Sequence, residues 1–281
     1  IKIYNNFESL NKIFKNKVDY TISAITGIDG LLPTLKIIKH TQKIAIANKE
    51  AIICGWHILK KELKKYGTEF VPVDSEHFST WYGLKKNKDS IDKIYLTASG
   101  GPFINYPLKN FYKINIEQAL KHPNWKMGKK ISIDSATMMN KVFEIIEAKH
   151  IFSIKYKNLS ILTHPESYIH SIIKFNNGLI KLIAHKTDMK IPIFNSIYTG
   201  NDKFILKHNE IDLSKLNRLN LKKIDLKKFP IVNIIKYLPE YNSLFETIIV
   251  SANDELVKLF LTKKIKFTDI SKKLMLFIKK P

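Results

Sequence analysis

Acidic side chains follow one of the short apolar runs of this chain in a pattern suited to binding a cation. Asp74 and Glu76 come directly after the run Phe70–Val73. In extended backbone, residues two apart point the same way, so both carboxylates could reach one ion. All-oxygen ligands favour a hard ion such as Mg²⁺ or Mn²⁺. An Asp-x-Glu pair at a strand end is also common in surface turns, and we expect the adjacent His77 to be structural.

A Ser-Gly-Gly-Pro run follows the next apolar stretch. Ile94–Thr97 predicts a strand after a polar linker over Lys85–Asp92, and Ser99 and its glycines come shortly after it. Glycine lets backbone N–H groups approach an anion closely, and the Ser99 hydroxyl adds a further donor. The run suits a phosphate group, although Gly-Gly-Pro also occurs in ordinary tight turns.

The stretch from His122 to Glu147 combines a His-Pro-Asn-Trp turn with a polar, then amphipathic, sequence. Ile131 and Ile133 alternate with polar residues, which predicts a brief strand. Asp134 and Ser135 are good N-cap residues, so a helix is expected directly after them.

The expected helix has two different sides. At about 100° per residue, one side is apolar and consists of Met138, Met139, Val142, Ile145 and Ile146. Asn140, Lys141 and Glu144 fall together on the opposite side. An amide, an ammonium and a carboxylate on one face could hold an anionic, hydroxylated ligand, whereas such a face taken alone is more often simply solvated.

The first seventy residues set the frame for these groups. After a surface helix within residues 1–20, strands alternate with helices at Tyr20–Ile25, Leu31–His40, Ile44–Ala47, 51–66 and Phe70–Val73. This alternation is typical of a parallel, doubly wound sheet, whose ligands bind beyond the carboxyl ends of the strands. Gly27–Gly30 and Asn48–Glu50 lie there. No G-x-G-x-x-G follows the first strand, so the sequence itself does not indicate a dinucleotide site.

Later segments predict a sheet and then helices. Leu159–Thr163 predicts a strand, and Ile172–Ile183 predicts a hairpin around Asn-Asn-Gly. Asn201–Lys228 is rich in Lys and Asn, which is typical of a connector. Residues 230–281 carry helical periodicity.

Composition bounds the possible partners. The 281 residues carry 47 Lys and Arg against 25 Asp and Glu, a net charge of +22. Lys is spread over nearly every segment and Arg218 is the only arginine, whereas proteins that read bases and phosphates lean on Arg. We therefore expect no nucleic-acid partner, and no apolar run reaches the roughly 18 residues of a membrane span. The single Cys54 excludes an intrachain disulfide and a zinc–thiolate site.

Several of these runs occur together, in order, in one known family. The chain resembles 1-deoxy-D-xylulose 5-phosphate reductoisomerase in the runs GLLPTL from Gly30, ANKE from Ala47, VDSEH from Val73, SGGPF from Ser99, HPNWxMG from His122, DSATMMNK from Asp134 and HPxSxIHS from His164. The resemblance is strong over residues 21–190 and loose in the C-terminal helices. It implies an α/β fold with a partial doubly wound NADPH-binding domain, an α+β catalytic domain with a flap, and a C-terminal helical domain.

The resemblance also implies an activity and the residues that carry it. Members of the family use NADPH and a divalent metal, Mn²⁺ or Mg²⁺, to rearrange and reduce 1-deoxy-D-xylulose 5-phosphate to 2-C-methyl-D-erythritol 4-phosphate for isoprenoid synthesis. The implied metal ligands are Asp74, Glu76 and Glu144, and the implied catalytic residues are Lys49, Glu76 and Glu144. The implied substrate-binding residues are Lys49, Ser75, Glu76, Ser99, His122, Ser135, Asn140, Lys141 and Glu144. The flap would carry Trp125 and Met127, and the nicotinamide side would be lined by Asn48, Glu50 and Gly128.

The resemblance divides the chain into parts. We expect residues 1–73 to form the second half of the NADPH-binding domain, with its first half upstream, and residues 74–200 to form the catalytic domain. Residues 201–229 would be the connector, and residues 230–281 a C-terminal helical domain that continues beyond Pro281. With these boundaries, the 281 residues alone should show little or no turnover.

Two other functions remain open at the level of sequence. One is a metal-dependent sugar-phosphate isomerase or lyase that uses no dinucleotide, because the glycine motif is missing. The other is a basic nucleic-acid-binding protein on an inactive scaffold, because of the +22 charge. The family also suggests a homodimer, and the Lys/Asn/Ile bias favours a plastid-type organelle (apicoplast or chloroplast) over the bacterial cytoplasm.

Overall fold

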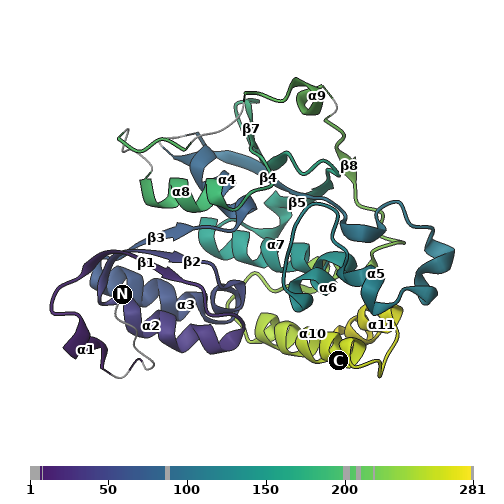
Figure 1. Cartoon of the computed structure of the whole chain (residues 1–281), viewed down its shortest axis with the longest axis horizontal. Helices are drawn as coiled ribbons and strands as arrows, with labels where there is room; N and C mark the ends of the chain where they lie inside the picture. The colour runs from purple at the N-terminus through teal and green to yellow at the C-terminus, as the bar shows by residue number, and fades with distance from the viewer. Residues whose placement is uncertain are drawn as a thin grey trace.

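The computed structural model describes residue 7 and residues 9–85, 89–198, 203–206, 210–217 and 219–279. Two sheets organise this part of the chain, with most of the helices packed around and below them (Figure 1). None of the described helices is long and apolar enough to cross a bilayer.

The first sheet is parallel. Its strand order is β1-β2-β3, formed by β1 (Val18–Ser23), β2 (Thr41–Ile46) and β3 (Glu69–Pro72). The crossovers are α2 (Leu31–Ile38) and α3 (Lys49–Tyr66), which pack against each other over a small apolar core around Ile44 and Leu59. The strand–helix alternation predicted for this segment is confirmed.

The second sheet is mixed, with the order β7-β6-β4-β5-β8. It comprises β4 (Ile91–Ala98), β5 (Leu159–Thr163), β6 (Ile169–Phe175), β7 (Ile180–Ala184) and β8 (Lys222–Lys223). The antiparallel β6–β7 pair confirms the predicted hairpin. β8 pairs with β5, so this sheet takes one strand from the segment whose composition predicted a connector.

Helix α7 (Met139–Phe152) runs through the middle of the molecule and contacts α3, β4 and β5 (Figure 1). The apolar side predicted for it is buried in the larger core, as Val142 and Ile145 illustrate with no exposed surface. Lys141 and Glu144 on the opposite side are also buried. The polar side is therefore not a solvated face.

The C-terminal region is helical, as predicted. η5 (Pro230–Tyr237), α10 (Phe245–Leu261) and α11 (Phe267–Ile278) share the larger core with α7. The remaining elements are α1 (Leu10–Ile13), η1 (Ile28–Gly30), α4 (Ser75–Leu84), η2 (Gly101–Phe103), η3 (Leu108–Lys113), α5 (Ile116–Leu120), α6 (Lys129–Thr137), η4 (Tyr156–Asn158), α8 (Lys190–Tyr198) and α9 (Leu213–Leu216).

The strand predicted at Ile131–Ile133 is wrong, because these residues belong to helix α6. Asp134 and Ser135 therefore lie inside a helix instead of capping the next one. The buried Asp134 carboxylate accepts from Lys130 one turn earlier, at 2.9 Å, and from the Asn253 amide at 2.8 Å. Met138 in the left-handed region, with φ 71°, separates α6 from α7.

Three other local predictions need correction. Ser75 opens α4, so Asp74 occupies an N-cap and Glu76 the first turn, and the backbone there is not extended. Within the described part of residues 1–20, only Leu10–Ile13 is helical, and β1 already begins at Val18. The linker predicted over 85–92 gives way to β4 at Ile91, and residues 86–88 lie outside the described chain.

Candidate active site

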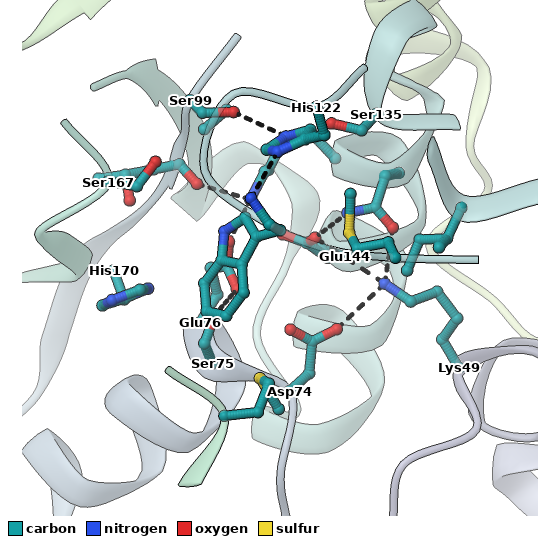
Figure 2. Close-up of a pocket in the computed structure, with 18 of the residues that line it drawn as sticks. Lys49, Asp74, Ser75, Glu76, Ser99, His122, Ser135, Glu144, Ser167 and His170 are labelled. Carbon is teal, nitrogen blue, oxygen red and sulfur yellow. Dashed lines mark hydrogen bonds and ion pairs between the residues drawn. The ribbon is translucent and has the colours of Figure 1, made fainter. Parts of the chain in front are cut away.

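A cavity of about 280 Å³ opens where β3 and β4 end, between the two sheets and α7. Figure 2 shows its side chains converging from segments far apart in the sequence. Every residue predicted to bind metal or substrate or to form the flap lines this cavity: Lys49, Asp74, Ser75, Glu76, Ser99, His122, Trp125, Met127, Ser135, Asn140, Lys141 and Glu144.

Three carboxylates meet on one side of the cavity. Asp74, Glu76 and Glu144 each offer an oxygen, and these oxygens all lie within 4.8 Å of one another. Burial, and next the Glu76 carboxylate, raise the pKa of Glu144 to about 8. Such crowding of like charges is relieved when a cation is shared, and an all-oxygen donor set fits Mg²⁺ or Mn²⁺. The residues present therefore fit a hard divalent ion.

Two buried ammonium groups accompany the carboxylates. Lys141 Nζ lies 2.6 Å from Glu76 Oε1, also contacts Glu144, and donates to the Thr97 carbonyl at 2.5 Å. Burial acts to raise the pKa of Glu76, but the charges of Lys141 and His170, with hydrogen bonds from Lys141 and Ser75, together hold that pKa well below its usual range. The Glu76 carboxylate is therefore ionised at neutral pH.

Lys49 enters the same cluster from the start of α3. Its Nζ donates to Asp74 Oδ2 at 3.0 Å and to Asn140 Oδ1 at 2.7 Å. Burial acts to lower the pKa of Lys49, but Asp74, Glu147 and Glu144 together raise it above its ordinary value. The Lys49 ammonium is therefore charged, and it faces the same carboxylates that would bind a metal.

The other side of the cavity carries neutral donors. His122 Nδ1 accepts the backbone N–H groups of Asn124, at 3.2 Å, and Trp125, at 3.0 Å. The ring proton of the neutral imidazole must then lie on Nε2, which is 3.2 Å from Ser99 Oγ. Burial lowers the pKa of His122 to about 4, so the ring is neutral near pH 7. With Ser135 beside them (Figure 2), these groups suit an anionic oxygen-rich ligand.

The backbone conformation at Gly100 and Gly101 lets the loop after β4 pack closely against helix α6. Gly101 has φ 63°, and a Cβ there would lie 2.8 Å from the Ser135 carbonyl oxygen. Only glycine permits this approach of the loop after β4 to helix α6. The Ser99 hydroxyl accepts the Gly101 N–H at 3.1 Å, and is thereby fixed beside α6.

Trp125 and Met127, which were predicted to form a flap, line one wall of the cavity. The amide of Asn124 donates to the Pro165 carbonyl at 2.9 Å and to Ser167 Oγ at 2.8 Å. The Trp125 ring meets the His170 ring edge-on, with centroids 6.5 Å apart. These contacts hold the turn at Asn124 and Trp125 against the residues that follow β5.

Residues predicted for the nicotinamide side do not line this cavity. The Asn48 side chain caps α3 and donates to the carbonyls of Ile25 and Gly27. The Glu50 carboxylate pairs with Lys130 at 2.9 Å. Gly128 is exposed, and a Cβ there would meet nothing within 4 Å.

Several cavity residues have no role in the sequence interpretation. Ser167, His170 and Met189 also line the cavity. Ser167 and His170 belong to the run HPxSxIHS, so the motif could have indicated them. Ser167 also has a positive φ of 51°, a backbone feature that the sequence does not reveal.

The fold and the site together define a metal-dependent α/β enzyme for a small anionic substrate. Three family profiles match the chain: 1-deoxy-D-xylulose 5-phosphate reductoisomerase over residues 1–55, its C-terminal domain over residues 70–152, and a second DXP reductoisomerase C-terminal domain over residues 185–280. The chain belongs to the 1-deoxy-D-xylulose 5-phosphate reductoisomerase family.

Named relatives and solved structures agree with this assignment. The reductoisomerase of Pelagibacter ubique (strain HTCC1062) is 65% identical over 98% of this chain and 71% of its own length. That of Sulfurihydrogenibium sp. (strain YO3AOP1) is 42% identical over 97% of this chain and 72% of its own length. The Zymomonas mobilis enzyme in complex with NADPH matches with a TM-score of 0.83 and 33% identity, over 94% of this chain and 69% of that one. A DOX-P reductoisomerase with NADPH, fosmidomycin and magnesium matches with a TM-score of 0.81 and 33% identity, over 93% of this chain and 67% of that one.

Proposed function

We propose that this chain carries the metal- and substrate-binding machinery for the NADPH-dependent conversion of 1-deoxy-D-xylulose 5-phosphate to 2-C-methyl-D-erythritol 4-phosphate. The observation that carries the proposal is the meeting of Asp74, Glu76 and Glu144 within 4.8 Å, beside a cavity wall of neutral donors. The related structures bound to NADPH, fosmidomycin and magnesium support both cofactors. They do not favour a dinucleotide-independent isomerase or a nucleic-acid-binding protein.

The two sides of the cavity would bind different parts of the substrate. Asp74, Glu76 and Glu144 would hold a divalent ion, which would supply Lewis-acid chemistry to the substrate. Ser99, His122 and Ser135, with Asn140 and Lys141 nearby, would hold the phosphate and adjacent hydroxyls as hydrogen-bond donors. Lys49 and Ser75 would contact the carbon chain between these ends.

The flap would exclude water during reduction. Trp125 and Met127 lie over the cavity, and Asn124 anchors the turn at Ser167. A closed flap strengthens every charge interaction beneath it because water is removed.

The predicted cofactor-binding residues fit a role in shaping the nicotinamide side. The Asn48 and Glu50 side chains already use polar atoms in contacts within the chain, so they would form the wall of this site instead of hydrogen-bonding to the cofactor. The open space beside Gly128 would let the edge of the nicotinamide approach the flap. In the same proposal, residues 1–73 belong to the NADPH-binding domain, 74–200 to the catalytic domain, 201–229 to the connector and 230–281 to the C-terminal helical domain.

The proposed function is tested by NADPH oxidation with 1-deoxy-D-xylulose 5-phosphate, with and without Mn²⁺. The assay compares the protein with its Glu144→Gln variant. We expect turnover that depends on Mn²⁺ and that this substitution abolishes. Metal-independent turnover, or undiminished turnover of the variant, would contradict this account.

A homodimer and a bacterial setting complete the proposal. β7 is an edge strand, and its side chains Ile180 and Leu182 are 55% and 47% exposed. An apolar sheet edge of this kind is suited to pairing with a second copy. Light scattering of the wild type and of Leu182→Lys tests this: we expect a dimer and a monomer, respectively.

The named relatives are bacterial, which supports the bacterial cytoplasm over the plastid-type organelle.

A further inference from the structure

Glu147 lies about one helical turn after Glu144 on α7, and both carboxylates approach Lys49. Only 2% of its surface is exposed, and it does not line the cavity. Its Oε2 is 3.2 Å from His77 Nε2 and 3.9 Å from Lys49 Nζ. Because the Glu147 carboxylate is buried, its electrostatic interactions with the neighbouring charged groups are strong.

The Lys49 ammonium has three carboxylates around it. Asp74 lies at 3.0 Å, Glu144 at 3.8 Å and Glu147 at 3.9 Å, and the neutral Asn140 oxygen lies at 2.7 Å. Asp74 and Glu144 also belong to the proposed metal cluster. When a divalent ion binds those two carboxylates, their negative charge stabilises the ion and is less available to stabilise the Lys49 ammonium. Among the carboxylates that contact Lys49, Glu147 is then the one left outside the cluster.

A metal ion and an ammonium group so close together repel each other. Without a separate counter-charge, Lys49 would either keep Asp74 and hinder metal binding, or leave the site when the metal enters. Glu147 offers that counter-charge from outside the group of Asp74, Glu76 and Glu144. His77, itself only 1% exposed, lies with its Nε2 at 3.2 Å from Glu147 Oε2.

We propose that Glu147 is a positioning residue: it holds the Lys49 ammonium in the site while a divalent ion occupies Asp74, Glu76 and Glu144. The inference rests on the proposed function, because it assumes the three-carboxylate metal site. It adds a residue that acts through Lys49 and that needs no contact with substrate, metal or cofactor.

A second arrangement of the same groups is the alternative to be tested. Asp74, His77 and Glu147 also bring one ligand atom each within 4.8 Å of one another. His77 and Glu147 do not line the cavity, however, whereas Asp74, Glu76 and Glu144 all do and offer only oxygen ligands. A metal ion bound at His77 would contradict the proposal.

The test is a double-mutant cycle on Mn²⁺ affinity, measured by electron paramagnetic resonance with Mn²⁺ alone. Glu147→Gln should weaken Mn²⁺ binding by about tenfold, because Lys49 then competes for Asp74 and Glu144. In the Lys49→Met background, the same substitution should change the affinity by less than about twofold. Glu255→Gln, an exposed carboxylate on α10, serves as the matched charge control and should have no effect.

The outcomes separate this inference from the function on which it rests. Equal weakening in both backgrounds, or no weakening in either, overturns the role of Glu147 through Lys49. Unchanged Mn²⁺ binding in Glu144→Gln would instead remove the metal site and the proposed function with it. Glu147→Asp keeps the charge and should retain most of the affinity, so the cycle remains informative if the Gln variant folds poorly. Circular dichroism of each variant checks the fold.

Discussion

The two sides of the cavity bind charge in different ways. On the carboxylate side, Asp74, Glu76 and Glu144 are held by the ammonium groups of Lys49 and Lys141. The donor side uses neutral groups that the backbone fixes, as when two N–H groups hold the His122 ring. In the proposed function, the carboxylate side would therefore exchange partners when a metal enters, whereas the donor side would already be arranged for an anion.

Because of this difference, substitutions on the two sides of the cavity should have effects of different size. A change on the carboxylate side leaves a buried charge without its partner, which costs several kcal/mol. A change on the donor side removes one hydrogen bond to the ligand, which costs about 1 kcal/mol. The predictions below use this contrast, from the largest expected effect to the smallest.

Glu76→Gln should abolish tight metal binding. It removes one ligand and leaves the Lys141 ammonium with one carboxylate fewer. We expect Mn²⁺ affinity to fall by at least about 100-fold, since a loss of about 3 kcal/mol corresponds to that factor. Titration calorimetry measures it, with Glu255→Gln as the control. A fall of less than tenfold would place the metal elsewhere.

Mn²⁺ affinity should depend on pH through Glu144. Its pKa of about 8 means that a proton occupies this carboxyl below pH 8 in the metal-free protein. Metal binding must displace that proton, so the apparent affinity should rise up to about tenfold per pH unit and level off above pH 8. The Glu144→Gln variant should lose this slope. An affinity that is flat from pH 6 to pH 8 in the wild type would contradict the crowding of the three carboxylates.

Ser135→Ala should affect the donor side alone. Removing one hydroxyl should weaken binding of 1-deoxy-D-xylulose 5-phosphate, measured with Mn²⁺ and without NADPH, by roughly fivefold to tenfold, the worth of about one hydrogen bond. Mn²⁺ affinity without the sugar phosphate should stay as in the wild type. Calorimetric titrations with each ligand separate the two effects. An equal loss of both affinities would show that the two sides are not independent.

The sequence predicted the members of the site better than the backbone that positions them. Each metal and substrate residue named from the motifs lines one cavity, because short runs such as VDSEH and SGGPF carry both the side chain and its turn. The parallel strands β1 to β3 were also predictable, since buried strands and crossover helices have clear hydrophobic patterns.

The junction between α6 and α7 was not predictable. Ile131 and Ile133 alternate as in a strand, yet Ile133 is buried in the core from a helix and Ile131 faces the cavity. The two helices are separated by a positive φ at Met138, a residue type that gives no sign of it. Local pattern cannot reveal a turn that tertiary packing imposes.

Interactions between distant segments were also beyond sequence patterns. Lys130 pairs with Glu50 and Asp254, and Glu147 lies beside Lys49, although no spacing links these positions. Such ion pairs depend on how α3, α6, α7 and α10 pack. Their importance for the site appears only when the helices are placed together.

The most direct test of this account is anomalous diffraction from crystals grown with Mn²⁺, recorded at the manganese absorption edge. We predict one strong peak in the cavity, coordinated by carboxylate oxygens of Asp74, Glu76 and Glu144. The absence of a peak there, or a peak coordinated by His77 and Glu147, would contradict the central claim that these three carboxylates form the metal site.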